Sequence, residues 1–123
     1  MSEIPLYTAS LIAALWGAAH LFATRSVVEG FGDITTDNRR IITMEWIVEG
    51  VTLISLAAFV AAATAIEPDA AVSSAVYAVA IGTLAVLGTV SLFTGFHIAF
   101  LPFRLCPLIF GISAALIAWG AWF

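Results

Sequence analysis

Four long apolar runs, separated by short polar segments, dominate the pattern of hydrophobic and polar positions. They cover about residues 5–24, 40–66, 72–100 and 105–123. A helix of roughly 20 residues crosses the ~30 Å hydrocarbon core of a bilayer, and each run is about that long or longer. In lipid every backbone polar group must be satisfied internally, which uninterrupted helices achieve. The pattern therefore predicts four membrane-spanning helices.

The segments between the runs contain residues that end helices or begin them. Gly30–Asp33 is a turn signal, and Thr36 or Asp37 is suited to cap the helix that follows. Glu67–Asp69 forms a short acidic turn after the second run. Phe100–Arg104 is predicted to be a tight connection, broken by a proline.

Composition supports the same fold class. Hydrophobic residues make up 63% of the 123 residues and charged residues 10%, whereas soluble domains carry roughly 25% charged residues. The length suits one four-span domain over residues 1–123 and leaves no room for a soluble domain. Gly82, Gly88 and Gly95 are predicted to allow close approach of neighbouring helices. We expect an all-α fold, an integral membrane antiparallel four-helix bundle.

Charge and cysteine content exclude several classes of function. The net charge is −4 and the chain has no lysine, which argues against nucleic acid as a partner. Cys106 is the only cysteine, so an internal disulfide and a CxxC redox pair are both excluded.

The arginines predict an orientation. With four spans, the first and third connections lie on one side of the membrane and both termini on the other. All the arginines flank those two connections, namely Arg25, Arg39, Arg40 and Arg104, whereas the opposite side carries Glu3, Glu67 and Asp69. The positive-inside rule then places both termini on the extracytoplasmic side of a bacterial or archaeal inner (plasma) membrane.

Two carboxyl groups occur early in the second run. Glu45 and Glu49 are four residues apart, so on a helix they share one face, and Thr52 extends the stripe. A carboxylate inside a membrane costs about 2.5–3.5 kcal/mol on insertion scales, and two neighbouring ones repel. Such groups usually face the interior of the bundle.

The topology gathers the polar and reactive residues at similar depth in the cytoplasmic half. We expect them to form a pocket open to the cytoplasm or to the inner leaflet. The residues are His20, Glu45, Glu49, His97, Arg104 and Cys106.

Three kinds of chemistry suit these residues. His20, Glu45 and Glu49 can form an acid/base set, because repulsion keeps one carboxyl protonated while the imidazole stabilises the other. The same residues with His97 provide the donors of an N2O2 metal site, and two histidines on different spans can ligate a haem. Finally, His20 or a protonated glutamate could donate to the carbonyls of a quinone. We expect no metal and no cofactor.

Each candidate also has a purely structural interpretation. The glutamates could neutralise nearby arginines, and His97 at the end of a span could be an interfacial residue. Cys106 is more readily a small apolar filler than a haem ligand. Trp16 and Trp46, which lie beside His20 and Glu45, could pack in the core instead of lining an aromatic pocket.

The segment Gly17–Phe22, followed by a short acidic loop and a second span, resembles small DoxX-like four-helix membrane proteins. Members of that family are linked to quinone or thiosulfate oxidation and to accessory roles, so the resemblance implies a redox-associated membrane subunit. A fainter likeness is to sterol-isomerase-type membrane bundles, which set intramembrane Glu and His around an apolar ligand. His20, Glu45 and Glu49 match that pattern in residue type.

The sequence therefore predicts a membrane protein that binds, and could convert by acid/base chemistry, a lipophilic small molecule such as a quinone, terpenoid or sterol-like compound. Such an enzyme would be isomerase- or cyclase-like, or a component of a quinone-linked oxidoreductase. An accessory subunit of a larger membrane complex and a small proton-coupled transporter are the alternatives. The expected partners are membrane lipid and the ligand, with a homo-oligomer or a larger complex left open. The predicted catalytic residues are His20, Glu45 and Glu49, and the predicted ligand-binding residues are Trp16, Trp46, Thr52, His97 and Arg104.

Overall fold

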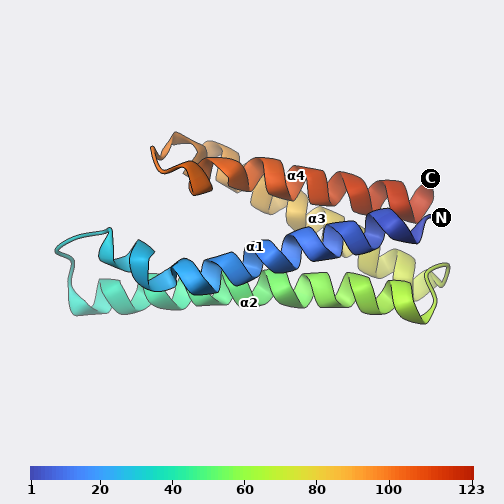
Figure 1. The fold of residues 1–123 in the computed structure, drawn as a ribbon, viewed down its shortest axis with the longest axis horizontal. Helices are drawn as coiled ribbons and strands as arrows, with labels where there is room; N and C mark the ends of the chain where they lie inside the picture. Colours follow the sequence, from blue (N-terminus) through green and yellow to red (C-terminus); the bar gives the residue numbers. More distant parts are fainter.

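The computed structural model describes residues 1–123 as four long helices joined by short connections (Figure 1). The helices are α1 (Glu3–Glu29), α2 (Thr36–Ile66), α3 (Ala71–Phe93) and α4 (Leu101–Trp122), with one turn of 3-10 helix, η1 (Gly95–His97), before α4. All four, counting α3 together with η1, are long and apolar enough to cross a membrane. The prediction of an all-helical protein with four candidate membrane spans is confirmed.

Both helices of the first pair extend beyond their apolar runs into the first connection. Helix α1 continues to Glu29, where Arg25 Nε donates to Glu29 Oε1 at 2.9 Å. Helix α2 begins early because Thr35 caps it, its hydroxyl oxygen accepting from the Asn38 N–H at 3.2 Å. The cap is thus one residue before the predicted Thr36. Gly32, with φ +70°, makes the predicted turn.

The α-helix of the third apolar run ends before the run does. Helix α3 stops at Phe93 rather than near Phe100, and η1 and a short extended segment follow it. Pro102, which the sequence suggested would break the connection, lies in the first turn of α4. A proline is tolerated there because the first N–H groups of a helix have no intrahelical partner.

The helices form a bundle of two pairs. Helix α1 packs along α2 and α3 along α4. The two pairs are joined by contacts between α1 and α4 and by fewer contacts between α2 and α3. Figure 1 shows the termini and the α2–α3 connection at one end, and the α1–α2 and α3–α4 connections at the other. The shared core contains Leu6, Leu53, Tyr77, Leu84, Phe110 and Ile117. Many other large apolar side chains are exposed, as expected for helices that face lipid.

The end that carries the termini, which we call the closed end, is tightly packed. The Ser2 N–H donates to the Gly120 carbonyl at 2.9 Å, and a Cβ on Gly120 would lie 2.7 Å from Leu6 Cγ. Near the α2–α3 connection, Thr64 Oγ1 donates to the Val60 carbonyl at 2.7 Å and lies 3.1 Å from the Tyr77 hydroxyl. The opposite end is open and contains the cavities described below.

The glycines that allow close helix packing are not the ones predicted. Nothing lies within 4 Å of a Cβ built on Gly82, so the prediction is wrong there. Gly88 and Gly95 have contacts of ordinary length at 3.5 and 3.4 Å. The true close approaches are at Gly120 and at a crossing of α1 with α2.

Candidate functional site

A glycine crossing positions the site. Where α1 meets α2, a Cβ on Gly17 would lie 2.7 Å from the Gly50 carbonyl oxygen, and one on Gly50 would lie 2.8 Å from the Gly17 carbonyl oxygen. Only glycines permit this spacing of the two backbones. Glu49 directly precedes Gly50, and His20 follows Gly17 by about one helical turn. The crossing therefore holds His20 against Glu49.

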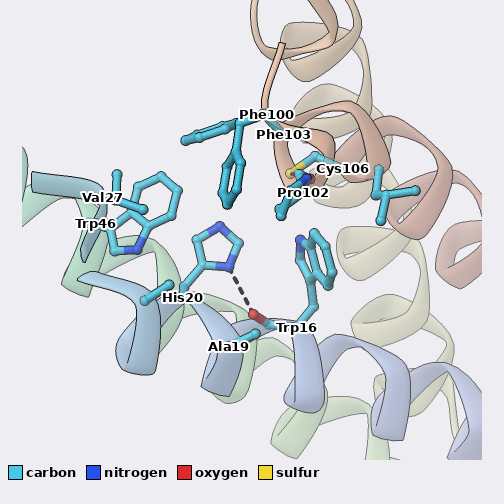
Figure 2. Close-up of a pocket in the computed structure, with 11 residues that line it drawn as sticks. Trp16, Ala19, His20, Val27, Trp46, Phe100, Pro102, Phe103 and Cys106 are labelled. Carbon is cyan, nitrogen blue, oxygen red and sulfur yellow. Dashed lines mark hydrogen bonds between the residues drawn. The ribbon is translucent and has the colours of Figure 1, made fainter. Parts of the chain in front are cut away.

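His20 is 5% exposed, and both of its ring nitrogens have neighbours. Nδ1 lies 2.8 Å from the Trp16 carbonyl oxygen (Figure 2). Because a carbonyl can only accept, Nδ1 is the donor in this hydrogen bond. Nε2 lies 3.5 Å from Oε1 of the half-buried Glu49. A proton carried by either Nε2 or the carboxyl group makes this second contact attractive.

Aromatic rings fix the imidazole from two sides. The Trp46 ring lies against His20 with centroids 4.7 Å apart, and Trp16 meets it edge-on at 6.0 Å. Phe103, in the first turn of α4, packs on Trp46 at 5.4 Å. These contacts tie the start of α4 to α1 and α2, and they hold the ring of His20 in one orientation.

An apolar cavity of about 250 Å³, the His20 cavity, lies between α1, α2 and the start of α4. Figure 2 shows Trp16, His20, Trp46, Phe100 and Phe103 around it. The lining residues are Trp16, Ala19, His20, Ala23, Val27, Trp46, Phe100, Pro102, Phe103, Leu105 and Cys106. Trp16 and Trp46 therefore line a pocket, whereas the sequence favoured core packing for both residues. His20 is the only one of these side chains that can carry a charge near neutral pH.

A second cavity of about 250 Å³, the Glu49 cleft, lies on the other side of His20. It opens between α2 and α3, which make the least contact of the neighbouring helix pairs, and Ser91 and Thr94 of the α3 end add hydroxyl groups. Both cavities include His20, Trp46, Phe103 and Cys106 among their lining residues. His20 thus separates an apolar compartment from a more polar one that contains a carboxyl group.

Glu45 and Thr52 lie on the predicted stripe with Glu49 but outside the His20 cavity. Both are exposed and line a groove of about 390 Å³ along α2. Glu49 also lines this groove, so the stripe runs from the Glu49 cleft along the surface of the bundle. The shared helix face is as predicted, but only Glu49 contacts His20.

His97 and Arg104 lie apart from His20. His97 is an exposed residue of η1 whose ring meets Phe96 edge-on, and the guanidinium carbon of Arg104 lies 5.2 Å from the Phe96 ring centre. Neither residue lines the His20 cavity or the Glu49 cleft. No three His, Cys, Asp or Glu side chains lie close enough together to hold a metal ion. The structure therefore does not assemble the N2O2 ligand set or pair the two histidines.

An apolar groove leads away from the His20 cavity. It has a volume of about 440 Å³ and shares Val27, Phe100 and Phe103 with the cavity. Phe31 and Ile98, from the two connections at the open end, complete its walls. Together the cavity and the groove provide a continuous apolar surface from His20 to the end of the bundle.

Sequence reasoning missed the contribution of the α4 start and of the glycine crossing. The sequence predicts only a connection at Phe100, Pro102 and Phe103, although two aromatic residues around a proline are also a signal for the rigid edge of a pocket. The sequence favours a filler role for Cys106, but the structure places this residue in the wall between the cavities. Gly17 lies next to Trp16, and Gly50 next to Glu49, which was the available signal for a crossing at the site.

Comparison with known proteins gives no match to a family model, a curated protein or a solved structure. The resemblance to DoxX-like proteins therefore stays a prediction, and the function has to be argued from the site itself.

Proposed function

We propose that the chain crosses a bacterial or archaeal inner membrane as an antiparallel four-helix bundle with both termini on the extracytoplasmic side. Four apolar helices and the arginines beside the two connections of the open end support this orientation. It places the His20 cavity in the cytoplasmic half. A reporter that is active only in the cytoplasm should be silent when fused after Phe123, and a strong signal would reverse the orientation.

We propose that the protein binds a lipophilic small molecule in the His20 cavity, with His20 and Glu49 as an acid/base pair beside the bound molecule. The observation that carries the proposal is a buried histidine on the wall of an apolar cavity, with its Nε2 3.5 Å from a carboxyl group on the other side. Ligand sites are typically apolar cavities with a few fixed polar groups. A buried ionisable residue in a membrane segment is expensive and is usually retained for function.

The two ring nitrogens of His20 give it a defined role. The Trp16 carbonyl holds the proton on Nδ1, so proton exchange takes place at Nε2 and Glu49. Glu49 also lines the groove that contains Glu45, which gives its proton a route toward the surface of the bundle. His20 and Glu49 are the proposed acid/base pair, and Glu45 would carry protons without touching the ligand.

The size of the site indicates what it can hold. The cavity of about 250 Å³ is slightly below the ~300–1,000 Å³ range of typical ligand pockets and suits one ring system. The adjoining groove of about 440 Å³ can hold an apolar tail. Both walls are apolar, so the ligand would enter from lipid at little desolvation cost.

Filling the cavity tests the proposal. Ala23→Trp places a large side chain in the cavity, whereas Ala58→Trp adds the same side chain at an exposed position of α2. Protein purified from membranes would be extracted and its bound lipophilic molecules identified by mass spectrometry. We expect a molecule that is retained by the wild type and by Ala58→Trp and lost by folded Ala23→Trp. Equal retention by both variants would contradict binding in this cavity.

A further inference from the structure

We propose that the protein binds the headgroup of an anionic phospholipid in a groove between α1 and α2, where Arg39 and Arg25 recognise its phosphate. The groove, which we call the Arg39 groove, has a volume of about 400 Å³ and lies at the open end of the bundle (Figure 1). It shares no lining residue with the His20 cavity. The proposal therefore goes beyond the ligand of that cavity and requires only that the helices cross a membrane.

Arg39 is a cation without a counter-charge. The residue is half-buried, and its guanidinium makes one hydrogen bond, from Nη2 to the Gly32 carbonyl at 3.2 Å. It forms no salt bridge, whereas the other two arginines of the first connection each pair with an acidic neighbour. A guanidinium has five N–H donors, so most of the donors of Arg39 remain free for an acceptor.

The groove as a whole favours an anion. Its only charged lining residues are Arg25, Glu29 and Arg39, and two arginines against one glutamate leave a net charge of +1. Arg25 uses Nε for Glu29 and keeps its two Nη groups for another acceptor. The hydroxyls of Thr24 and Thr43 donate to carbonyls of their own helices, so the arginines supply the free donors. Guanidinium groups match phosphate oxygens in charge and in geometry.

The apolar part of the wall indicates that the phosphate belongs to a lipid. Leu21 and Phe22 also line the groove, about one helical turn before Arg25 and therefore deeper in the bundle. The Phe22 side chain is 90% exposed and that of Leu21 37%, so both offer apolar surface to acyl chains. Charged groups at the helix ends with apolar groups below them match a headgroup above its chains. Basic pockets between membrane helices are known to hold such headgroups.

Two lipids with the same acyl chains test the preference for an anion. Phosphatidylglycerol carries a net negative charge and phosphatidylcholine carries none. Delipidated protein would be titrated with each lipid in one detergent, and the bound lipid counted by native mass spectrometry. We expect phosphatidylglycerol to bind about fivefold more tightly, which is the effect of about one arginine facing an anionic headgroup. Glycerol phosphate in large excess, which has the phosphate without the chains, should not displace it.

Neighbouring arginines provide matched variants. Arg39→Gln and Arg25→Gln each bring the net charge of the groove to zero, so each should abolish the preference for phosphatidylglycerol. Arg40→Gln removes the same charge from an exposed residue that does not line the groove, and it should keep the preference. The Arg25 side chain is 91% exposed, so Arg25→Gln tests the groove even if Arg39→Gln fails to fold.

Three results would overturn the proposal. The first is equal binding of the two lipids by the wild type. The second is the same loss of preference in Arg40→Gln as in Arg39→Gln, because the attraction would then come from the overall charge of this end. The third is displacement by glycerol phosphate, which would assign the groove to a soluble phosphate compound. None of them bears on the His20 cavity, whose lipophilic molecule should be retained equally by wild type and Arg39→Gln.

Discussion

The closed end and the open end of this bundle are built from different kinds of side chain. At the closed end α1 presents Leu6, Ala9 and Ala13 to its neighbours, and Gly120 lets α4 approach so closely that a methyl group would not fit. At the open end the same helices meet through Trp16, Trp46 and Phe103, and a cavity of about 250 Å³ lies between them. Small residues bring helices together, whereas large rings around a proline hold them apart.

The two ends of the bundle therefore have different roles. The glycine crossing and the closed end fix the helices, so the open end can keep a cavity without losing the fold. Sites held by a rigid scaffold keep their catalytic groups in place when the cavity is empty. A variant that damages the closed end or the crossing should therefore unfold the protein, and one that alters the open end should change binding first.

The largest effect should come from forcing the crossing apart. Gly17→Leu places a side chain where even a Cβ would lie 2.7 Å from the Gly50 carbonyl oxygen. Overpacking a core typically costs about 1–3 kcal/mol, and a backbone obstacle cannot rotate away, so we expect a loss of at least that size. Gly82→Leu is the control, because nothing lies within 4 Å of a Cβ there. Thermal unfolding in detergent should separate the two, and equal unfolding temperatures would show that the crossing is not close.

A smaller effect on stability, with a larger one on binding, is expected from Glu49→Gln. Glutamine keeps the shape of the side chain and can donate to Nε2 of His20, so the unfolding free energy should change by no more than about 1 kcal/mol. The negative charge that stabilises a protonated imidazole is lost, and retention of the co-purified molecule should fall. Glu45→Gln, on the same helix face but without contact to His20, should keep it.

Unfolding temperature and ligand retention, measured on the same preparations, show whether the pair of Glu49 with His20 serves ligand binding or only the stability of the fold. A Glu49→Gln protein that is clearly less stable yet keeps its ligand would make the pair with His20 a structural contact. The open end would then not differ from the closed end in function.

The smallest effect is expected from removing the exposed ion pair of Arg25 and Glu29 at the open end. Arg25 pairs with Glu29 at 2.9 Å, but its side chain is 91% exposed. Exposed ion pairs contribute roughly 0–1 kcal/mol, so Arg25→Ala should leave unfolding nearly unchanged. It should also leave ligand retention unchanged, since neither residue lines the His20 cavity. A marked drop in ligand retention would show that the binding site extends to this ion pair.

Sequence patterns were sufficient for the helices and for part of the site. Apolar runs of spanning length identified the four helices, and the four-residue spacing placed Glu45 and Glu49 on one face. The end of α3 at Phe93 could not be predicted from hydropathy. The segment Phe93–Phe100 is apolar apart from Thr94 and His97, so the pattern contains no signal that ends the helix. The pairing of His20 with Glu49 depends on the Gly17–Gly50 crossing, a contact between distant parts of the chain that periodicity along one helix does not encode.

Reactivity of the only cysteine tests most directly whether the open end admits small lipophilic molecules while the closed part does not. Cys106 lines the His20 cavity, whereas Ser113 is a fully buried residue of the core that borders none of the cavities described here. The wild type would be compared with Ser113→Cys in a Cys106→Ala background, using N-ethylmaleimide, a small uncharged reagent, and intact-mass measurement under native conditions. We predict modification of Cys106 and no modification at position 113 until the protein unfolds. Equal protection of both thiols in the folded protein would contradict an accessible cavity beside His20.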